Sequence, residues 1–284
     1  MQPDEMQSAG VIAGLSGRSV VITGGAGGLG VAIATELHRQ GAQLLLVDVD
    51  TKGLGDVRES LAVETLGADI ADPDDRELIS ILCGRLGIVP DILINNAGVE
   101  RASEFVRVER AEIRHALDVN LVGTMLLTHA LLPAMQRRGE GHVITIASMA
   151  GIKPVPFNAV YNTAKAGLVA FSTSLSKELD GTGVHATVIC PAAVTGVGMW
   201  ARASDRLTAN RFVDSSTVTP DAVVAAVLRA IARRPRRILV GSPLVRAGAL
   251  LSALSPRLDR ATDRLSRIEA VYRERIDTDR DNRL

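Results

Sequence analysis

Aromatic residues and cysteines are scarce in this chain. Aromatic side chains make up 2% of its 284 residues, with one Trp, two Tyr and four Phe. The hydrophobic share is nevertheless 46%, so the core must be aliphatic, built from Val, Leu, Ile and Ala. The two cysteines, Cys83 and Cys190, are far apart and lie in apolar surroundings, which argues against a disulfide framework or a cysteine-based metal site. We therefore predict a reducing, cytoplasmic location.

Net charge, metal-ligand clusters and long apolar runs are also lacking. The 32 basic and 32 acidic residues cancel, and nothing in that balance points to a nucleic-acid partner. The five histidines are scattered without metal-ligand spacing, so no metal site is predicted. No apolar stretch approaches the roughly 18–20 residues that a membrane span needs. The acidic N-terminus lacks the basic start and apolar run of a signal peptide, and residues 1–16 are predicted to be a flexible arm.

Short apolar runs alternate with helical stretches through residues 18–241. The runs lie at residues 19–22, 44–47, just before 69, 91–94, 142–147, 185–190 and 238–240. They are continuously apolar rather than alternating, which is typical of parallel strands buried on both faces. Strands separated by helices indicate βαβ units with right-handed crossovers. The predicted fold is α/β, a Rossmann-type doubly wound, seven-stranded parallel sheet with helices on both faces. Residues 17–241 would form the dinucleotide-binding catalytic domain, and residues 242–284 a helical extension.

A glycine cluster, Thr23-Gly24-Gly25-Ala26-Gly27-Gly28-Leu29-Gly30, follows the first strand and precedes a helix. Small residues let the backbone approach a pyrophosphate, and the helix N-terminus offers N–H groups and a partial positive charge. The alternative is a tight turn that needs positive φ.

Asp48 lies 18 residues after Gly30, close to the interval expected of a ribose-binding acid. Its carboxylate would accept hydrogen bonds from the adenosine hydroxyls and repel a 2′-phosphate. Neither residues 25–27 nor Val49 supply an Arg or Lys, so NAD is favoured over NADP. The alternative is an ordinary turn aspartate at a strand end.

Tyr161 and Lys165 are four residues apart, a spacing that puts both on one helix face. A free phenol has a pKa near 10, and a neighbouring ammonium lowers that value. A tuned tyrosine can then exchange a proton with a hydroxyl or carbonyl. Ser148 lies thirteen residues upstream, at the end of a predicted strand.

These separated motifs, in this order, resemble the classical short-chain dehydrogenase/reductase family over about residues 16–241. The glycine cluster matches the family's TGxxxGxG, and Ser148 with Tyr161 and Lys165 matches its catalytic Ser and YxxxK. Three further matches are Asn95-Asn96-Ala97-Gly98 to NNAG, Asn120 to the asparagine that completes the catalytic tetrad, and Asp69-Ile70 to the pair that meets the adenine.

The resemblance implies a role for each member of the catalytic set. Tyr161 would be the general acid/base, and Lys165 would lower its pKa and hold the nicotinamide ribose. Ser148 would hydrogen-bond the substrate oxygen where charge develops. Asn120, in a distorted helix, would hold a water linking Lys165 to solvent; alternatively it is a satisfied polar residue in a helix interface. Predicted cofactor-binding residues are Gly24, Gly27, Gly28, Leu29, Gly30, Asp48, Asp69, Ile70, Asn96, Ala97, Gly98, Tyr161, Lys165, Pro191, Val194 and Thr195.

The segment after the sixth strand departs from the family pattern PGxVxT. It reads Pro191-Ala192-Ala193-Val194-Thr195-Gly196, with the threonine one place early. The backbone contact at Val194 to the cofactor carboxamide is expected to survive. Either Thr195 supplies the hydroxyl contact after a small shift, or nothing does.

Residues 197–219 are predicted to form a lid over the substrate. Met199, Trp200 and Phe212 lie in it, and Val155-Pro156-Phe157 lies opposite, which implies an apolar pocket. The alternative is that Met199 and Trp200 only pack the lid. The predicted substrate is a lipophilic secondary alcohol or ketone that resembles a steroid, retinoid or terpenoid, with NAD as cofactor. Alternatives are an NADPH-dependent carbonyl reductase and a non-catalytic dinucleotide-binding regulator.

The stretch that leads into the extension and forms its start is basic and apolar. Between Ala222 and Leu258 there are seven arginines and no acidic residue. Such a composition is compatible with a membrane-surface helix, but docking on the domain or on a neighbouring subunit is favoured. The leucines that recur near helical spacing, and are expected to be buried there, are Leu244, Leu250, Leu251, Leu254 and Leu258. A homodimer or homotetramer is expected.

Overall fold

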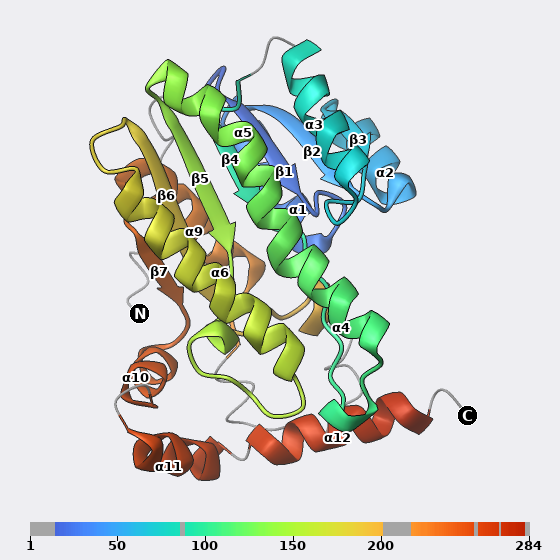
Figure 1. Ribbon diagram of the computed structural model, residues 1–284, viewed down its shortest axis with the longest axis vertical. Coiled ribbons are helices and arrows are strands. Elements are labelled where there is room, and N and C mark those ends of the chain that lie inside the picture. The colour runs from blue at the N-terminus through green and yellow to red at the C-terminus, as the bar shows by residue number, and fades with distance from the viewer. Residues whose placement is uncertain (1–14, 86–88, 201–216, 253–254, 267, 282–284) are drawn as a thin grey trace.

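A computed structural model gives the fold of this chain, and it describes residues 15–85, 89–200, 217–252, 255–266 and 268–281 (Figure 1). Most of the predicted arm at residues 1–16 therefore lies outside the described residues. So do residues 201–216 of the predicted lid, with Phe212 among them, and Leu254 of the extension.

A single seven-stranded sheet forms the centre of the molecule. Its order is β3-β2-β1-β4-β5-β6-β7, and every neighbouring pair is parallel. The strands are β1 (Ser19–Thr23), β2 (Gln43–Asp48), β3 (Glu64–Gly67), β4 (Ile92–Asn95), β5 (Gly141–Ile146), β6 (Val184–Pro191) and β7 (Arg237–Val240). The strand order reverses between β1 and β4, which is where open α/β sheets bind ligands. The predicted fold class is confirmed.

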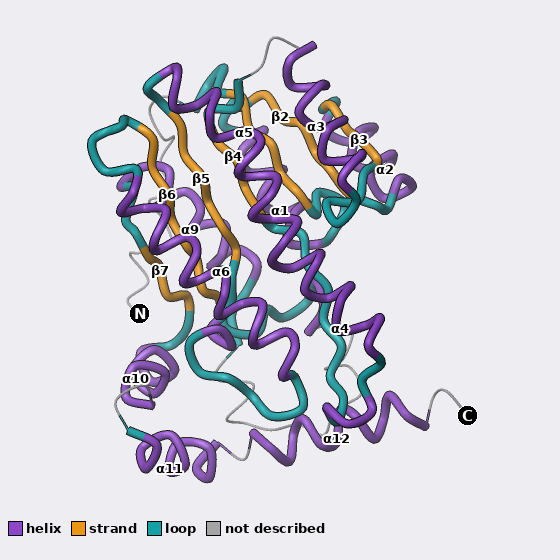
Figure 2. Tube along the Cα trace, viewed as in Figure 1, coloured by secondary structure: helices purple, strands orange, loops and turns teal. Residues whose placement is uncertain are grey.

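Helices cover both faces of the sheet, as Figure 2 shows. One face carries α1 (Gly28–Arg39), α2 (Thr51–Leu61) and α9 (Pro220–Arg233); the other carries α3 (Pro73–Arg85), α5 (Thr124–Arg138) and α6 (Ala159–Glu178). Adjacent strand residues point to opposite faces, so Ile22 packs in the first core and Val21 in the second. Each strand is therefore apolar along its whole length.

The helix before β5 contains a distorted segment. It begins as α4 (Arg110–Leu117), passes through a π-helical stretch at Asp118–Gly123 and continues as α5. The run Arg110–Arg138 is long and apolar enough to cross a membrane by length and composition, which corrects the expectation that no stretch qualifies. A core helix passes the same test, and Leu127 and Met135 of this run are fully buried against the sheet. Short 3₁₀ turns lie at Phe105–Arg107 and Met149–Gly151.

Three further helices follow β7: α10 (Pro243–Ser252), α11 (Pro256–Ser266) and α12 (Ile268–Asp281). They lie beyond the carboxyl ends of the strands, where α12 runs across the end of the molecule (Figure 1). Their described buried apolar residues are Ala249, Val271 and Tyr272, which pack on the domain. The expected burial of the leucines on this chain's own surface is wrong. The leucines that are instead 42–68% exposed are Leu244, Leu250, Leu251 and Leu258.

Candidate active site

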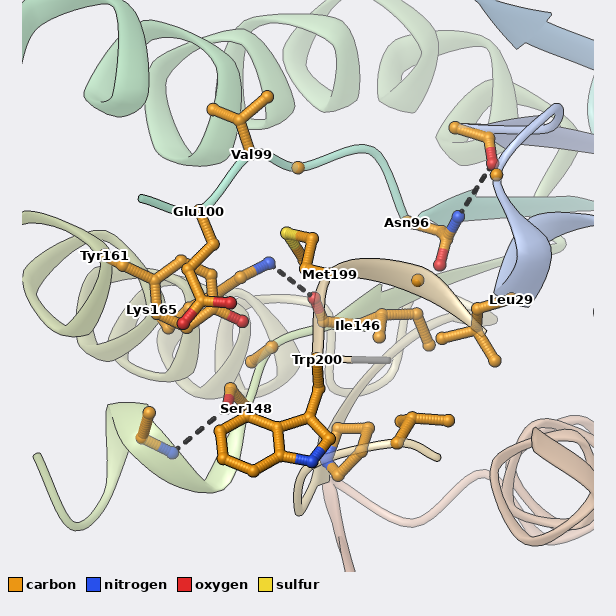
Figure 3. Close-up of a pocket in the computed structure, with 18 of the residues that line it drawn as sticks. Leu29, Asn96, Val99, Glu100, Ile146, Ser148, Tyr161, Lys165, Met199 and Trp200 are labelled. Atoms are coloured by element: carbon orange, nitrogen blue, oxygen red, sulfur yellow. Dashed lines mark hydrogen bonds between the residues drawn. The ribbon is translucent and has the colours of Figure 1, made fainter. Parts of the chain in front are cut away.

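A cavity of about 1210 Å³ opens at the carboxyl ends of the strands (Figure 3). The glycine turn and the ends of β2, β4, β5 and β6 contribute one part of its lining. The extension contributes another part, from α10, α11 and α12. A cavity of this volume has room for a dinucleotide and a small substrate together.

The glycine turn is shaped by two close approaches of the backbone. Gly24 has φ +68°, a left-handed conformation that other residues rarely adopt. A Cβ at Gly30 would lie 2.0 Å from the Gly24 carbonyl oxygen, so no side chain fits there. The first turn of α1 therefore packs directly against the loop, and its N-terminus faces the cavity with Gly27, Gly28 and Leu29 in the lining.

Acidic residues gather at the β2 and β3 end of the cavity. Asp48, Asp50 and Asp69 line it there. Asp48 Oδ2 accepts a hydrogen bond from the Ala26 backbone N–H at 3.0 Å, so the carboxylate lies directly beside the glycine turn. Among the described lining residues, the two lysines, Lys153 and Lys165, belong to the Ser148 end instead. These three carboxylates make the potential at this end of the cavity negative, which disfavours the binding of another anionic group there.

The segment after β4 is cross-linked to the glycine turn. Asn96 Nδ2 donates to the carbonyl oxygens of Thr23 at 3.1 Å and Gly24 at 3.0 Å. Its neighbours Ala97 and Gly98 line the cavity. Asp69 and Ile70 line it as well, and Asp69 Oδ1 accepts from the Ala71 N–H at 2.8 Å. The structure thus brings these predicted residues to one edge.

Ser148, Tyr161 and Lys165 meet at the other end of the cavity (Figure 3). Ser148 follows β5; its hydroxyl accepts a hydrogen bond from the Ala150 backbone N–H at 3.1 Å and lies close enough to the Tyr161 phenol to lower the pKa of that group. Lys165 Nζ lies 5.6 Å from the Tyr161 ring centroid and donates to the Ile146 carbonyl oxygen at 3.2 Å. A Cβ at Gly151 would lie 2.6 Å from the Lys165 carbonyl oxygen, so this glycine permits the turn after Ser148 to approach α6. The structure therefore places Tyr161 and Lys165 on one face of α6, beside Ser148.

The acid–base balance of this trio differs from the sequence expectation. Burial and the Glu100 carboxylate raise the pKa of Tyr161, and they outweigh the lowering by the hydrogen bond from Ser148. Burial also lowers the pKa of Lys165 to about 8. The expected lowering of the phenol pKa is therefore wrong for this arrangement, because burial penalises both charged forms. Tyr161 holds its proton at neutral pH and can act as an acid.

Asn120 lies in the π-helical stretch, as the implied distortion requires. Its Oδ1 accepts from the Val99 N–H at 3.1 Å, and its Nδ2 donates to the carbonyl oxygens of Val99 and Ala116, both at 2.8 Å. A Cβ at Gly98 would lie 2.7 Å from Asn120 Oδ1 and 3.4 Å from Lys165 Nζ. The side chain is a satisfied polar group that holds the loop after β4 beside Lys165, while its role toward a water stays a prediction.

The Thr195 hydroxyl, a predicted cofactor contact, is bonded within the protein in this structure. Its hydroxyl donates to the Val218 carbonyl oxygen at 3.3 Å, and its backbone N–H donates to the same oxygen at 2.9 Å. Thr195 does not line the cavity, whereas Pro191 and Val194 do. The bridge between Val194 and Val218 fixes the backbone here, so the hydroxyl is directed away.

The substrate side of the cavity is mostly apolar. Its lining from the domain includes Val99, Met149, Val155, Met199 and Trp200. The extension adds Leu244, Val245, Ala249, Ile268 and Tyr272. The rings of Trp200 and Tyr272 lie 6.0 Å apart at a tilt of 48°.

Two charged contacts hold the extension against this side. Lys153 Nζ binds Asp259 at 2.9 Å and Asp263 at 2.7 Å, both on α11. Arg275 of α12 binds Glu100, from the loop after β4, at 3.0 Å.

Sequence reasoning missed Glu100, Tyr272 and Arg275 as members of the site. No local motif marks Glu100 or Arg275. Tyr272 carried one usable signal, since it is the second of only two tyrosines in the chain.

Comparisons with known proteins point to one family. The family model described as short chain dehydrogenase matches residues 18–207. A ketoacyl reductase, HetN of Nostoc sp., is 37% identical over 232 residues, covering 80% of this chain and 79% of that protein. The structure of a 3-ketoacyl-(acyl-carrier-protein) reductase from Brucella melitensis, complexed with NADH, is 26% identical with a TM-score of 0.72, covering 80% of this chain and 97% of that one. Levodione reductase is 25% identical with a TM-score of 0.73, covering 82% and 99%.

Proposed function

Because the chain belongs to the short-chain dehydrogenase/reductase family, we propose that it is an NAD(H)-dependent reductase. The proposed substrate is a lipophilic ketone, and within that class an oxoacyl chain. The observation that carries the proposal is the meeting of Ser148, protonated Tyr161 and Lys165 at one end of an apolar cavity. The family establishes oxidoreductase chemistry; the direction, the cofactor form and the substrate class are our proposal.

Tyr161 supplies the proton in the proposed reaction. Its phenolic O–H bond breaks as the carbonyl oxygen takes the proton, while the carbonyl carbon accepts a hydride and the carbonyl π electrons move to oxygen. Ser148 donates a hydrogen bond to that oxygen where negative charge develops. Lys165, with a pKa of about 8, can return a proton from Nζ to the phenolate. A secondary alcohol results.

The residues at the other end of the cavity fit a nicotinamide dinucleotide. The α1 N-terminus offers backbone N–H groups to a pyrophosphate, and the missing side chains at Gly24 and Gly30 let it approach. Asp48 would hold the adenosine hydroxyls, Asp69 with Ile70 the adenine, and Lys165 the nicotinamide ribose. When bound, the cofactor supplies the hydride.

The substrate class rests on the apolar lining and on the named relatives. Two of the similar proteins are ketoacyl reductases by name, whereas nothing in the comparisons supports the steroid, retinoid or terpenoid substrates that the sequence suggested. An acyl chain would lie along the apolar side chains from Met199 to Tyr272.

A turnover screen tests the proposed function. The purified chain is assayed with NADH and NADPH on 3-oxoacyl thioesters, and on steroid, terpenoid, retinoid and small cyclic ketones. We expect the oxoacyl thioesters to give the highest kcat/KM, at least about tenfold above the polycyclic ketones, which corresponds to about 1.4 kcal/mol of transition-state binding. Turnover confined to polycyclic ketones would refute the substrate class. No turnover on any ketone or alcohol would favour a dinucleotide-binding regulator.

Cofactor preference depends on Asp48 in this proposal. A 2′-phosphate would meet the Asp48 carboxylate at an end of the cavity that Asp50 also lines, and hydrogen bonds to a charged group are worth roughly 1.5–3 kcal/mol each. We expect the unmodified enzyme to prefer NADH over NADPH by at least about tenfold in kcat/KM. Asp48→Ser is expected to erode the preference mostly by weakening NADH.

Asp48→Asn is the matched control, since it keeps an acceptor for the Ala26 N–H and removes only the charge. We expect it to relieve the penalty on NADPH while leaving the glycine turn intact. Equal kcat/KM values for both cofactors in the unmodified enzyme would contradict the assignment and favour an NADPH-linked carbonyl reductase.

A further inference from the structure

A buried ion pair joins the extension to the catalytic end of the cavity. Arg275 Nη1 lies 3.0 Å from Glu100 Oε1, and the two side chains are only 6% and 7% exposed. Glu100 also accepts a hydrogen bond from Asn158 Nδ2. The Arg275 guanidinium lies 5.7 Å from the Trp200 ring centroid and 5.6 Å from that of Tyr272. Its position is therefore fixed by packing as well as by charge.

The Glu100 end of this pair belongs to the site itself. Glu100 and Tyr161 both line the cavity, and Figure 3 shows the Glu100 side chain extending from the loop after β4 toward Tyr161 and Lys165. A carboxylate this close disfavours ionisation of the phenol. A cation beside the carboxylate offsets that effect. Those are the directions found: Glu100 raises the pKa of Tyr161, and Arg275 lowers it.

We propose that Arg275 is a positioning residue for the reaction, which holds the Glu100 carboxylate in an ion pair and so offsets its charge at the Tyr161 hydroxyl. Because Arg275 lies on α12, the docking of this helix affects the proton transfer from Tyr161. The proposal rests on the proposed function only for the role of Tyr161 as proton donor. The other titratable groups that face Tyr161 are Lys165 on α6, His115 on α4 and Tyr272 on α12.

A second attachment separates this electrostatic role from simple anchoring. Lys153 ties α11 to the turn after Ser148 through Asp259 and Asp263. Loss of Lys153 would loosen the extension and leave the Glu100–Arg275 pair in place. Loss of Arg275 would loosen it too, but would also leave the Glu100 carboxylate uncompensated beside Tyr161.

The chain's two tyrosines allow a direct measurement. With Tyr272→Phe as the background, the ultraviolet absorbance of phenolate reports Tyr161 alone, and the Tyr161→Phe/Tyr272→Phe protein is the blank. The full chain is titrated without cofactor. We expect Arg275→Met to move the onset of Tyr161 ionisation to higher pH by about one unit, and Glu100→Gln to move it to lower pH by about as much. The double variant should return close to the background value, and Lys153→Met should not shift it.

Opposite shifts that cancel in the double variant are the expected result. Shifts in the same direction, no shift, or an equal shift with Lys153→Met would overturn the proposal. If Arg275→Met does not fold, Arg275→Gln takes its place with the same expected upward shift. Because the titration needs no turnover, the two failures are distinguishable: shifts without ketone reduction refute the proposed function, and reduction without shifts refutes the role of Arg275.

Discussion

Tyr161→Phe should lower kcat by roughly 10²–10⁴, the usual worth of general acid–base catalysis. The substitution removes the proton donor and keeps the ring that packs on α6. The hydride would then reach a carbonyl carbon whose oxygen has no acid beside it, and Ser148 alone offers only a hydrogen bond. Turnover of the best ketone at saturating cofactor is the measurement.

Two controls accompany this variant. Cofactor affinity, measured by titration, should change little, because most of the cofactor-binding residues lie at the other end of the cavity. Thr163→Ala, an exposed position two residues along the same helix, should keep its activity. Retention of most of the turnover in Tyr161→Phe would show that another group donates the proton.

Lys165→Met should be at least as damaging to turnover as Tyr161→Phe, because it removes both the proton source at Nζ and the proposed contact with the nicotinamide ribose. It should nevertheless not destabilise the fold at neutral pH. Lys165 is 3% exposed, and burial holds its pKa at about 8, below the usual value near 10.5. Below pH 8 the folded chain must keep an ammonium in a site that disfavours it. We expect the variant to gain roughly 1–3 kcal/mol in the free energy of unfolding at pH 7.

The sign of this effect depends on pH. The folded-state pKa is lowered, so the unfolded chain binds more protons between about pH 8 and 10.5, and the stability of the unmodified protein rises through that window. The gain of Lys165→Met should therefore be full below pH 8 and should vanish above about pH 10.5. Lys177→Met, at the exposed end of the same helix, is the control for removing a lysine from this helix. Equal stability of Lys165→Met and the unmodified protein at pH 7 would mean that the amine is better solvated than its burial indicates.

The extension changes what the site presents to a substrate. Tyr272 and Ile268 of α12 line the same cavity as Ser148, and Thr262 of α11 lines it as well. The seven arginines between Ala222 and Leu258 had suggested a membrane surface, yet the described charged anchors, Lys153 and Glu100, bind the extension to the domain. Because the leucines of α10 are exposed, contact of this helix with a neighbouring subunit or a membrane stays a prediction.

The sequence by itself determined the sheet, the glycine turn and the Tyr161–Lys165 pair. Each of these depends on a local sequence pattern. A strand shows as a continuous apolar run, a shared helix face as a four-residue spacing, and the turn as a cluster of glycines. The order of the strands followed, since right-handed crossovers leave few topologies open. Asn120 in a distorted helix was predictable only through the family resemblance.

Tertiary structure decided the other features of the site. They depend on which distant segments pack together and on how much water that packing excludes. Glu100 and Arg275 are 175 positions apart, and only the docking of α12 makes them a buried pair. The hydroxyl of Thr195 turned to Val218 because a bridge fixes the backbone there. The phenol of Tyr161 became a weaker acid rather than a stronger one, since spacing predicts which charges are near, whereas burial decides what those charges cost.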